Sequence, residues 1–146
     1  MRRIAVVDDD TMFLDMMAAV LEEGGWDTEV YREGDAAFSA LKRTQPDLII
    51  LDIRMETPET GWTILELLRL DPATVSIPVI VCSAAILDLR SHQRWLQEHG
   101  IAVLPKPFDL AELFHLVDEA LTKRGRQSWW RRLALRWIPA RLRRFQ

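Results

Sequence analysis

Side chains able to handle a phosphoryl group or a cation occur at four separated points of the chain. Three aspartates stand together at Asp8–Asp10, and a fourth stands at Asp52, while Ser83 and Lys106 follow further along. Carboxylates within about 4–6 Å of one another raise at least one pKa strongly unless a cation screens them. Mg²⁺ suits one or two carboxylates together with water and phosphate oxygens. A lysine and a hydroxyl could hold the other phosphoryl oxygens, which indicates phosphoryl-transfer chemistry.

Short apolar runs lie directly before these residues and predict the elements that position them. The first, third and fourth runs are nearly continuous in Val, Ile and Leu, as in strands that are covered on both faces of a parallel sheet. The predicted strands are Ile4–Val7, Thr28–Tyr31, Leu48–Leu51, Val79–Cys82 and Ile101–Leu104.

Segments of helical pattern separate the predicted strands. The first helix begins with Thr11 as its cap and ends at Gly24 and Gly25, because glycine commonly terminates helices. Asp10 is expected at the N-terminal end of this helix, where its charge favours the helix dipole, rather than as a metal ligand. The further helices are predicted at Gly34–Thr44, Thr60–Leu70, Leu87–His99 and Leu110–Lys123.

Five strands that alternate with five helices predict an open, doubly wound α/β fold with a five-stranded parallel sheet. Right-handed crossovers place the carboxyl ends of all strands at one edge of such a sheet. Ligands bind at that edge, beside the point where the strand order reverses. We therefore expect the aspartates, Ser83 and Lys106 to converge there.

Four motifs together resemble the receiver domain of two-component response regulators, a flavodoxin-like fold. They are Val6–Asp10 (VVDDD), Pro46–Met55 (PDLIILDIRM), Ser83-Ala84 and Lys106-Pro107-Phe108, in the family's order and spacing. The resemblance covers about residues 2–123. It implies that Asp52 is the phosphoacceptor.

The resemblance also implies a Mg²⁺ site. Asp9 and Asp52 would bind the ion directly, together with the backbone carbonyl of Arg54, and Asp8 would act mainly through water.

Two further residues would contact the phosphoryl group. The resemblance implies that Lys106 pairs with it, that Ser83 donates a hydrogen bond to it, and that the Lys106–Pro107 peptide bond is cis.

The function implied is that of a single-domain response regulator in a phosphorelay. It would accept its phosphoryl group from a histidine kinase, a phosphotransfer protein or a small phosphodonor, and would signal by phosphorylation-dependent protein interaction. It would not be an enzyme, apart from slow loss of its own phosphoryl group.

Two alternatives stay open. A Mg²⁺-dependent phosphatase or phosphotransferase of similar fold could use the Asp-x-Asp pattern in Asp8–Asp10, but the chain has no inserted cap region and Asp52 would have no role. A receiver-shaped module that is never phosphorylated should have lost an acid or the lysine, and neither is lost here.

Three features depart from the family pattern. The loop after Asp52 is one residue longer and more acidic, Val103 replaces an aromatic residue, and Pro105 precedes Lys106. The aromatic couples phosphorylation to a surface change in the family, so we expect a different output route here.

Net charge divides the chain near residue 123. Residues 123–146 carry nine Lys or Arg and no acid, so, with −3 for the whole chain, the first 122 residues carry −12. This asymmetry predicts a receiver domain over 1–123 and a basic, Trp-rich C-terminal tail over 124–146.

The chain has no run of about 18 apolar residues and its N-terminus is too short for a signal peptide, which predicts a cytoplasmic protein.

The tail predicts an amphipathic helix. Trp130, Leu133, Ala134, Trp137 and Ile138 recur at helical spacing, and Pro139 is expected to break the helix. Its partner stays open between a protein or a second copy of the chain, an anionic membrane surface, and nucleic acid, which ranks last. Intramolecular docking, in which the tail folds back on the acidic body of the same chain, also stays open. Oligomerisation and peripheral membrane attachment are compatible with these alternatives.

Overall fold

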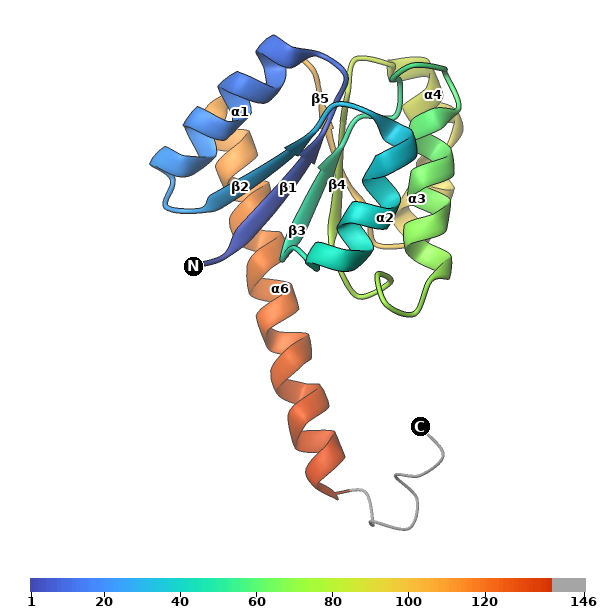
Figure 1. The fold of residues 1–146 in the computed structure, drawn as a ribbon. Helices are drawn as coiled ribbons and strands as arrows, with labels where there is room; N and C mark the ends of the chain where they lie inside the picture. Colours follow the sequence, from blue (N-terminus) through green and yellow to red (C-terminus); the bar gives the residue numbers. More distant parts are fainter. Residues whose placement is uncertain (138–146) are drawn as a thin grey trace.

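A parallel sheet forms the centre of the molecule (Figure 1). The computed structural model describes residues 1–137, and the side chains of residues 1–125. The strand order is β2-β1-β3-β4-β5, and all pairs are parallel. The strands are β1 (Arg3–Val7), β2 (Asp27–Tyr31), β3 (Leu48–Leu51), β4 (Val79–Ser83) and β5 (Ala102–Pro105). The predicted flavodoxin-like sheet is thereby confirmed.

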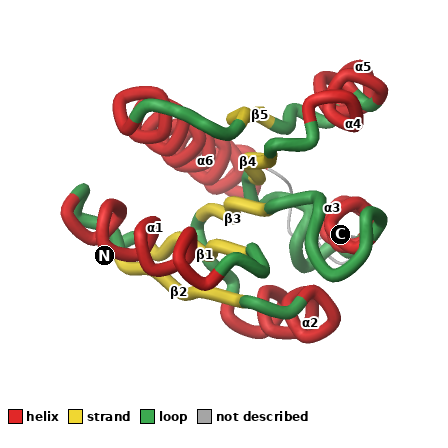
Figure 2. The backbone as a smooth tube through the Cα atoms, turned by 90° about the horizontal axis from the view of Figure 1, so that it is seen from above, coloured by secondary structure: helices red, strands yellow, loops and turns green. Residues whose placement is uncertain are grey.

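Helices cover both faces of the sheet, in two layers that Figure 2 shows from above. One layer holds α1 and α6, and the other holds α2 to α5. The helices are α1 (Thr11–Glu23), α2 (Gly34–Thr44), α3 (Thr60–Leu70), α4 (Ile86–Ser91), α5 (Gln93–Glu98) and α6 (Leu110–Trp137).

The continuous apolar strands explain this arrangement. Successive side chains of a strand point to opposite faces, so Ile4 and Val6 of β1 pack toward α1 and α6, whereas Ala5 and Val7 pack toward α2 and α3. All four are completely buried. A strand with two buried faces has no room for polar residues until it ends, and β1 ends directly before Asp8.

The fourth predicted helix, Leu87–His99, is wrong as a single element, and the described residues therefore form six helices rather than five. The backbone leaves helical geometry at His92 (φ −107°, ψ 8°), which separates α4 from α5. Two side chains compete there for one backbone carbonyl, since Ser91 Oγ and His92 Nδ1 each bond the oxygen of Asp88 at 2.9 Å. The His92 ring also stacks on Trp62 of α3 at 4.0 Å.

The start of α1 differs from the prediction as well. Asp10, rather than Thr11, is the N-cap, and its Oδ1 accepts hydrogen bonds from the N–H groups of Met12 and Phe13 at 3.0 and 3.2 Å. A carboxylate one residue before the helix satisfies two free donors of the first turn. Thr11 is already the first helical residue.

The last helix does not end at Lys123 as predicted. α6 continues through Gly125 to Trp137 and extends beyond the sheet (Figure 1). The change in charge near residue 123 therefore falls inside one helix. The predicted break at Pro139 lies outside the described residues.

No helix among the described residues is long and apolar enough to cross a membrane.

Candidate functional site

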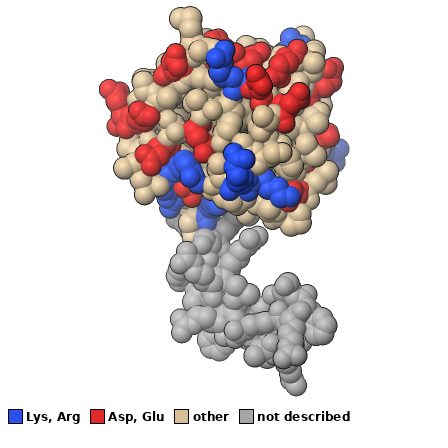
Figure 3. Space-filling model, in the orientation of Figure 1, with Lys and Arg blue, Asp and Glu red and all other residues tan. Residues whose placement is uncertain are grey.

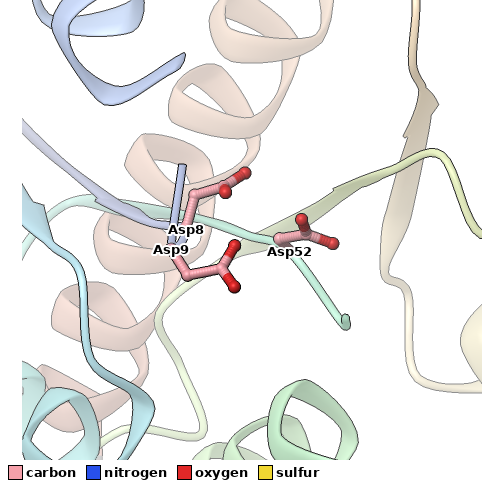
Figure 4. Close-up of side chains that lie close together, drawn as sticks. All are labelled: Asp8, Asp9 and Asp52. Atoms are coloured by element: carbon pink, nitrogen blue, oxygen red, sulfur yellow. The ribbon is translucent and has the colours of Figure 1, made fainter. Parts of the chain in front are cut away.

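Three carboxylates meet at the carboxyl edge of the sheet, between β1 and β3. Asp8 and Asp9 follow β1, and Asp52 follows β3, whose residues pair directly with β1. The strand order reverses at this pair, which is where doubly wound sheets bind ligands. One oxygen from each carboxylate lies within 4.8 Å of the others (Figure 4). The predicted convergence of these aspartates is therefore found in the structure.

Lys106, which follows β5, joins the same cluster. Its Nζ lies 2.7 Å from Oδ2 of Asp8 and 3.4 Å from Oδ2 of Asp52. The ammonium group also lies 3.9 Å from the centre of the Phe13 ring, which adds a cation–π contact. The lysine therefore lies within reach of both the Asp8 and the Asp52 carboxylates.

Burial and the neighbouring charges shift the pKa values of the groups in this site. Asp8 is 1% exposed, and burial raises the pKa of its carboxyl group even though Lys106 opposes the shift. Partial burial and the charge of Asp8 raise the pKa of Asp9. Burial alone would lower the pKa of Lys106, but its hydrogen bond to Asp8 and the charge of Asp52 raise it. One lysine therefore faces three carboxyl groups.

This donor set fits a hard divalent cation. Carboxylate oxygens are the ligands that Mg²⁺ prefers in proteins, and three of them are available at one point. Asp9 is exposed, so the cluster is open to solvent on that side. Asp8 has protein partners for both oxygens, Lys106 on Oδ2 and the N–H of Asp10 on Oδ1 at 2.9 Å.

Ser83 and Lys106 are tied together by the pairing of β4 with β5. Ser83 is opposite Pro105 in the sheet, and its carbonyl accepts a hydrogen bond from the N–H of Lys106 at 3.0 Å. Its buried hydroxyl accepts a hydrogen bond from the N–H of Ala85 at 3.2 Å. The peptide bond between Lys106 and Pro107 is cis, as the family resemblance implies.

The loop after Asp52 also contacts the carboxylate of that residue. The N–H of Arg54 donates to Oδ1 of Asp52 at 3.1 Å. One acidic residue of this loop also has a structural partner, because Oε1 of Glu56 accepts a hydrogen bond from the N–H of Gly34 at the start of α2. The expected role of the Arg54 carbonyl as a metal ligand stays a prediction.

Two contributions to the site were missed by reasoning from the sequence. The side chain of Arg54 bonds Oδ2 of Asp88 in α4 at 3.2 Å, and no local pattern links residues so far apart. Gly61 packs against the backbone next to Asp52, where a Cβ atom would lie 2.1 Å from Cα of Ile53 and 2.5 Å from the carbonyl oxygen of Asp52. A glycine early in α3 was the available signal for this close approach.

The fold and the site together define a flavodoxin-like α/β protein with an acidic, lysine-containing centre at its switch point. The sequence model of the response regulator receiver domain matches residues 4–118. The chain therefore belongs to the receiver domain family of two-component response regulators.

Individual relatives agree with this assignment. The DNA-binding dual master transcriptional regulator RpaA of a Synechocystis strain is 30% identical over 126 residues, which cover 86% of this chain and 52% of RpaA. The chain thus spans about half the length of the curated relatives it matches first.

Solved structures show the same fold. A putative response regulator from Chloroflexus aurantiacus is 26% identical, with a TM-score of 0.72 over 83% of this chain and 98% of that one. The receiver domain of the sensor histidine kinase PA1611 from Pseudomonas aeruginosa is 22% identical, with a TM-score of 0.71 over 83% and 98% of the two chains. A magnesium ion is coordinated in the active site cleft of that domain.

Proposed function

We propose that this receiver accepts a phosphoryl group on Asp52 and acts as a phosphorylation-dependent signalling switch. The observation that carries the proposal is the contact of Lys106 with Asp8 and Asp52, beside a third carboxylate within 4.8 Å. Phosphoryl transfer requires mainly positioning and charge stabilisation, and this edge of the sheet provides both.

In transfer from a phosphohistidine, the bond that forms, the bond that breaks and the added charge can all be assigned to named groups. One carboxylate oxygen of Asp52 forms the new O–P bond while the P–N bond to the donor imidazole breaks and the imidazole nitrogen takes the electron pair. Lys106 Nζ, 3.4 Å from Asp52, pairs with the added negative charge. The Ser83 hydroxyl at the end of β4 turns to donate a hydrogen bond to a phosphoryl oxygen.

We propose Mg²⁺ as the cofactor of this step. Asp9, Asp52 and the backbone carbonyl of Arg54 would hold the ion, with Asp8 acting through water. When bound, Mg²⁺ supplies positive charge for the phosphoryl oxygens. The magnesium ion in the PA1611 receiver domain and the carboxylate cluster of this chain support the proposal.

The proposed donor is a sensor histidine kinase or a phosphotransfer protein, and the proposed location is the cytoplasm. Signalling by protein contact, rather than turnover of a metabolite, is the proposed output, with slow hydrolysis of the chain's own aspartyl phosphate. A phosphatase based on Asp8–Asp10 is disfavoured, since Asp8 is paired with Lys106 and the carboxylate of Asp10 caps α1.

The ion pair between Arg54 and Asp88 offers an output route in a chain that has Val103 in the aromatic position. Arg54 lies two residues after the acceptor, and its side chain bonds α4 at 3.2 Å. A phosphoryl group on Asp52 carries about −1.5 to −2 charge and attracts arginine strongly. We expect phosphorylation to draw Arg54 away from Asp88 and to loosen α4.

Incubation with acetyl phosphate, followed by intact-mass measurement, tests the function. We expect the native chain to gain one phosphoryl mass in Mg²⁺ and none in EDTA, and Asp52→Asn to gain none. Asp10→Asn is the matched control, because Asn caps helices as well as Asp does. Modification of Asp52→Asn, or equal modification without a divalent cation, would contradict the proposal.

A further inference from the structure

The second half of α6 is the feature that the receiver function leaves unexplained. Among residues 1–125, whose side chains the structure describes, Arg124 Nη1 donates to the Pro46 carbonyl at 2.7 Å and Arg2 Nη1 donates to the Leu121 carbonyl at 2.8 Å, which ties this part of the helix to the body. Beyond Gly125 the helix continues for twelve residues, to Trp137. At 1.5 Å per residue, this extension (residues 126–137) is about 18 Å long.

The apolar pattern of the helix changes sides where the body ends. In the first half, Leu113, Val117 and Leu121 are buried against the sheet. In the extension, four of the six apolar positions, 130, 133, 134 and 137, form one stripe, and positions 129 and 135 fall outside it. At 100° per residue, this stripe is centred about 150° around the helix axis from the buried positions. It is therefore not a continuation of the domain core.

Three of the four arginines of the extension lie on its other side, whereas Arg126, at its start, falls within the apolar stripe. Positions 131, 132 and 136 are centred about 170° from the apolar stripe at the same helical period. Residues 126–146 hold seven arginines and no acid, so their net charge is +7. Three of the six tryptophans of the chain, at 129, 130 and 137, belong to this short segment. A basic helix with Trp and Leu on one side is typical of helices that lie in a membrane interface.

We propose that the α6 extension binds the surface of an anionic lipid bilayer. The stripe lies on nearly the opposite side of the helix from the sheet, so a bilayer that covers the stripe leaves the receiver on the side away from the lipid. Tryptophan suits the headgroup region, and each arginine near an anionic surface strengthens attachment.

The acidic body restricts contact to the extension. Residues 1–125 carry −10, because Lys123 and Arg124 offset two of the twelve negative charges. Figure 3 shows acidic side chains over much of the face of the body in view, with Lys and Arg gathered along its lower edge. Exposed Glu112 and Glu119 also lie on the outer side of the first half of α6. The net charges therefore favour contact of anionic lipid with the extension over contact with the body.

Other partners fit the extension less well. A second copy of the helix would bring two +7 segments together along a stripe of about two turns, whereas a coiled coil needs three or more heptads. Nucleic acid would use the arginines and leave the Trp and Leu stripe exposed. Folding back on the same receiver would require the helix to break, because α6 runs on beyond the sheet as one continuous helix to Trp137 (Figure 1).

Co-sedimentation of the full chain with vesicles tests the proposal. The vesicles are phosphatidylcholine alone or a mixture that contains phosphatidylglycerol. We expect binding to the anionic vesicles that weakens with salt, and little binding to the neutral ones.

The matched control is W130R/R131W/R136W/W137R, which keeps composition and charge but scatters the apolar positions around the helix. We expect it to bind anionic vesicles at least about tenfold more weakly. Unchanged urea unfolding and unchanged labelling by acetyl phosphate would show that its receiver is intact, and would keep this test separate from that of the proposed phosphoacceptor.

Equal binding of both chains to anionic vesicles would overturn the proposal, because charge alone would then suffice. It would also be overturned if the native chain failed to bind, if it formed dimers at vesicle-binding concentrations, or if it bound a DNA duplex more tightly than the vesicles.

Discussion

Replacing Lys106 with methionine removes the positive charge that lies between two buried carboxylates. With an effective dielectric constant of about 20, the lysine attracts Asp8 at 2.7 Å by about 6 kcal/mol and Asp52 at 3.4 Å by about 5 kcal/mol. Burial of the lysine offsets part of this, and removal of one partner from a buried pair costs about 3–5 kcal/mol overall. The Lys106 side chain is 21% exposed, so we expect a loss of about 3 kcal/mol in Lys106→Met at pH 7 without divalent cations.

Urea unfolding in EDTA measures this loss, and Lys42→Met provides the matched control. Lys42 lies as close to Asp71, at 2.8 Å, but its side chain is 51% exposed. Such surface pairs contribute about 0–1 kcal/mol. The comparison therefore separates burial from distance.

Acidification adds a second readout. The folded-state pKa of Asp8 already lies above its ordinary value, and loss of the lysine raises it further. A carboxyl group whose pKa is raised by folding stabilises the folded chain fully at pH values below its unfolded-state pKa. This stabilisation is lost as pH rises through its folded-state pKa. The deficit of Lys106→Met should therefore shrink between pH 7 and pH 5. Equal losses in the two variants, or a deficit that does not change with pH, would refute this account of the site.

Three further predictions concern the same edge of the sheet. The native chain without divalent cations should become more stable as pH falls from 7 toward 5, since the pKa values of Asp8 and Asp9 are raised, and Mg²⁺ should remove this trend; urea midpoints across pH check it. Gly61→Ala should lose about 1–3 kcal/mol in urea unfolding, because the new methyl group meets backbone atoms at 2.1 Å; an unchanged midpoint would show that the backbone yields freely. Cys82 is 1% exposed, and burial raises the pKa of its thiol to about 12, so Ellman's reagent should label it only after unfolding; rapid labelling of the folded chain would contradict this.

The sheet and the position of the site could be predicted from the sequence because both depend on short local patterns. β3 and the helices α2 and α3 have the predicted bounds, since continuous apolar runs, glycine and proline mark them clearly. Because the carboxyl ends of parallel strands lie at one edge of the sheet, the meeting of Asp8 and Asp52 could be predicted without any knowledge of side-chain contacts.

The differences arise where side chains compete with local pattern. His92 interrupts the fourth predicted helix through its bond to the Asp88 carbonyl and its stacking on Trp62, a residue of another element. Asp10 caps α1 in place of Thr11 because its carboxylate reaches two free N–H groups. The contact of Arg54 with Asp88 depends on how α4 packs, which no short motif records.

Hydride trapping tests the proposed acceptor most directly. Sodium borohydride reduces an aspartyl phosphate to homoserine, which peptide mass spectrometry then locates in the chain. After labelling with acetyl phosphate and Mg²⁺, we predict homoserine at position 52 in the native chain and in Asp10→Asn. Homoserine at position 8 or 9, or none anywhere in a chain that gained phosphoryl mass, would contradict the assignment of Asp52.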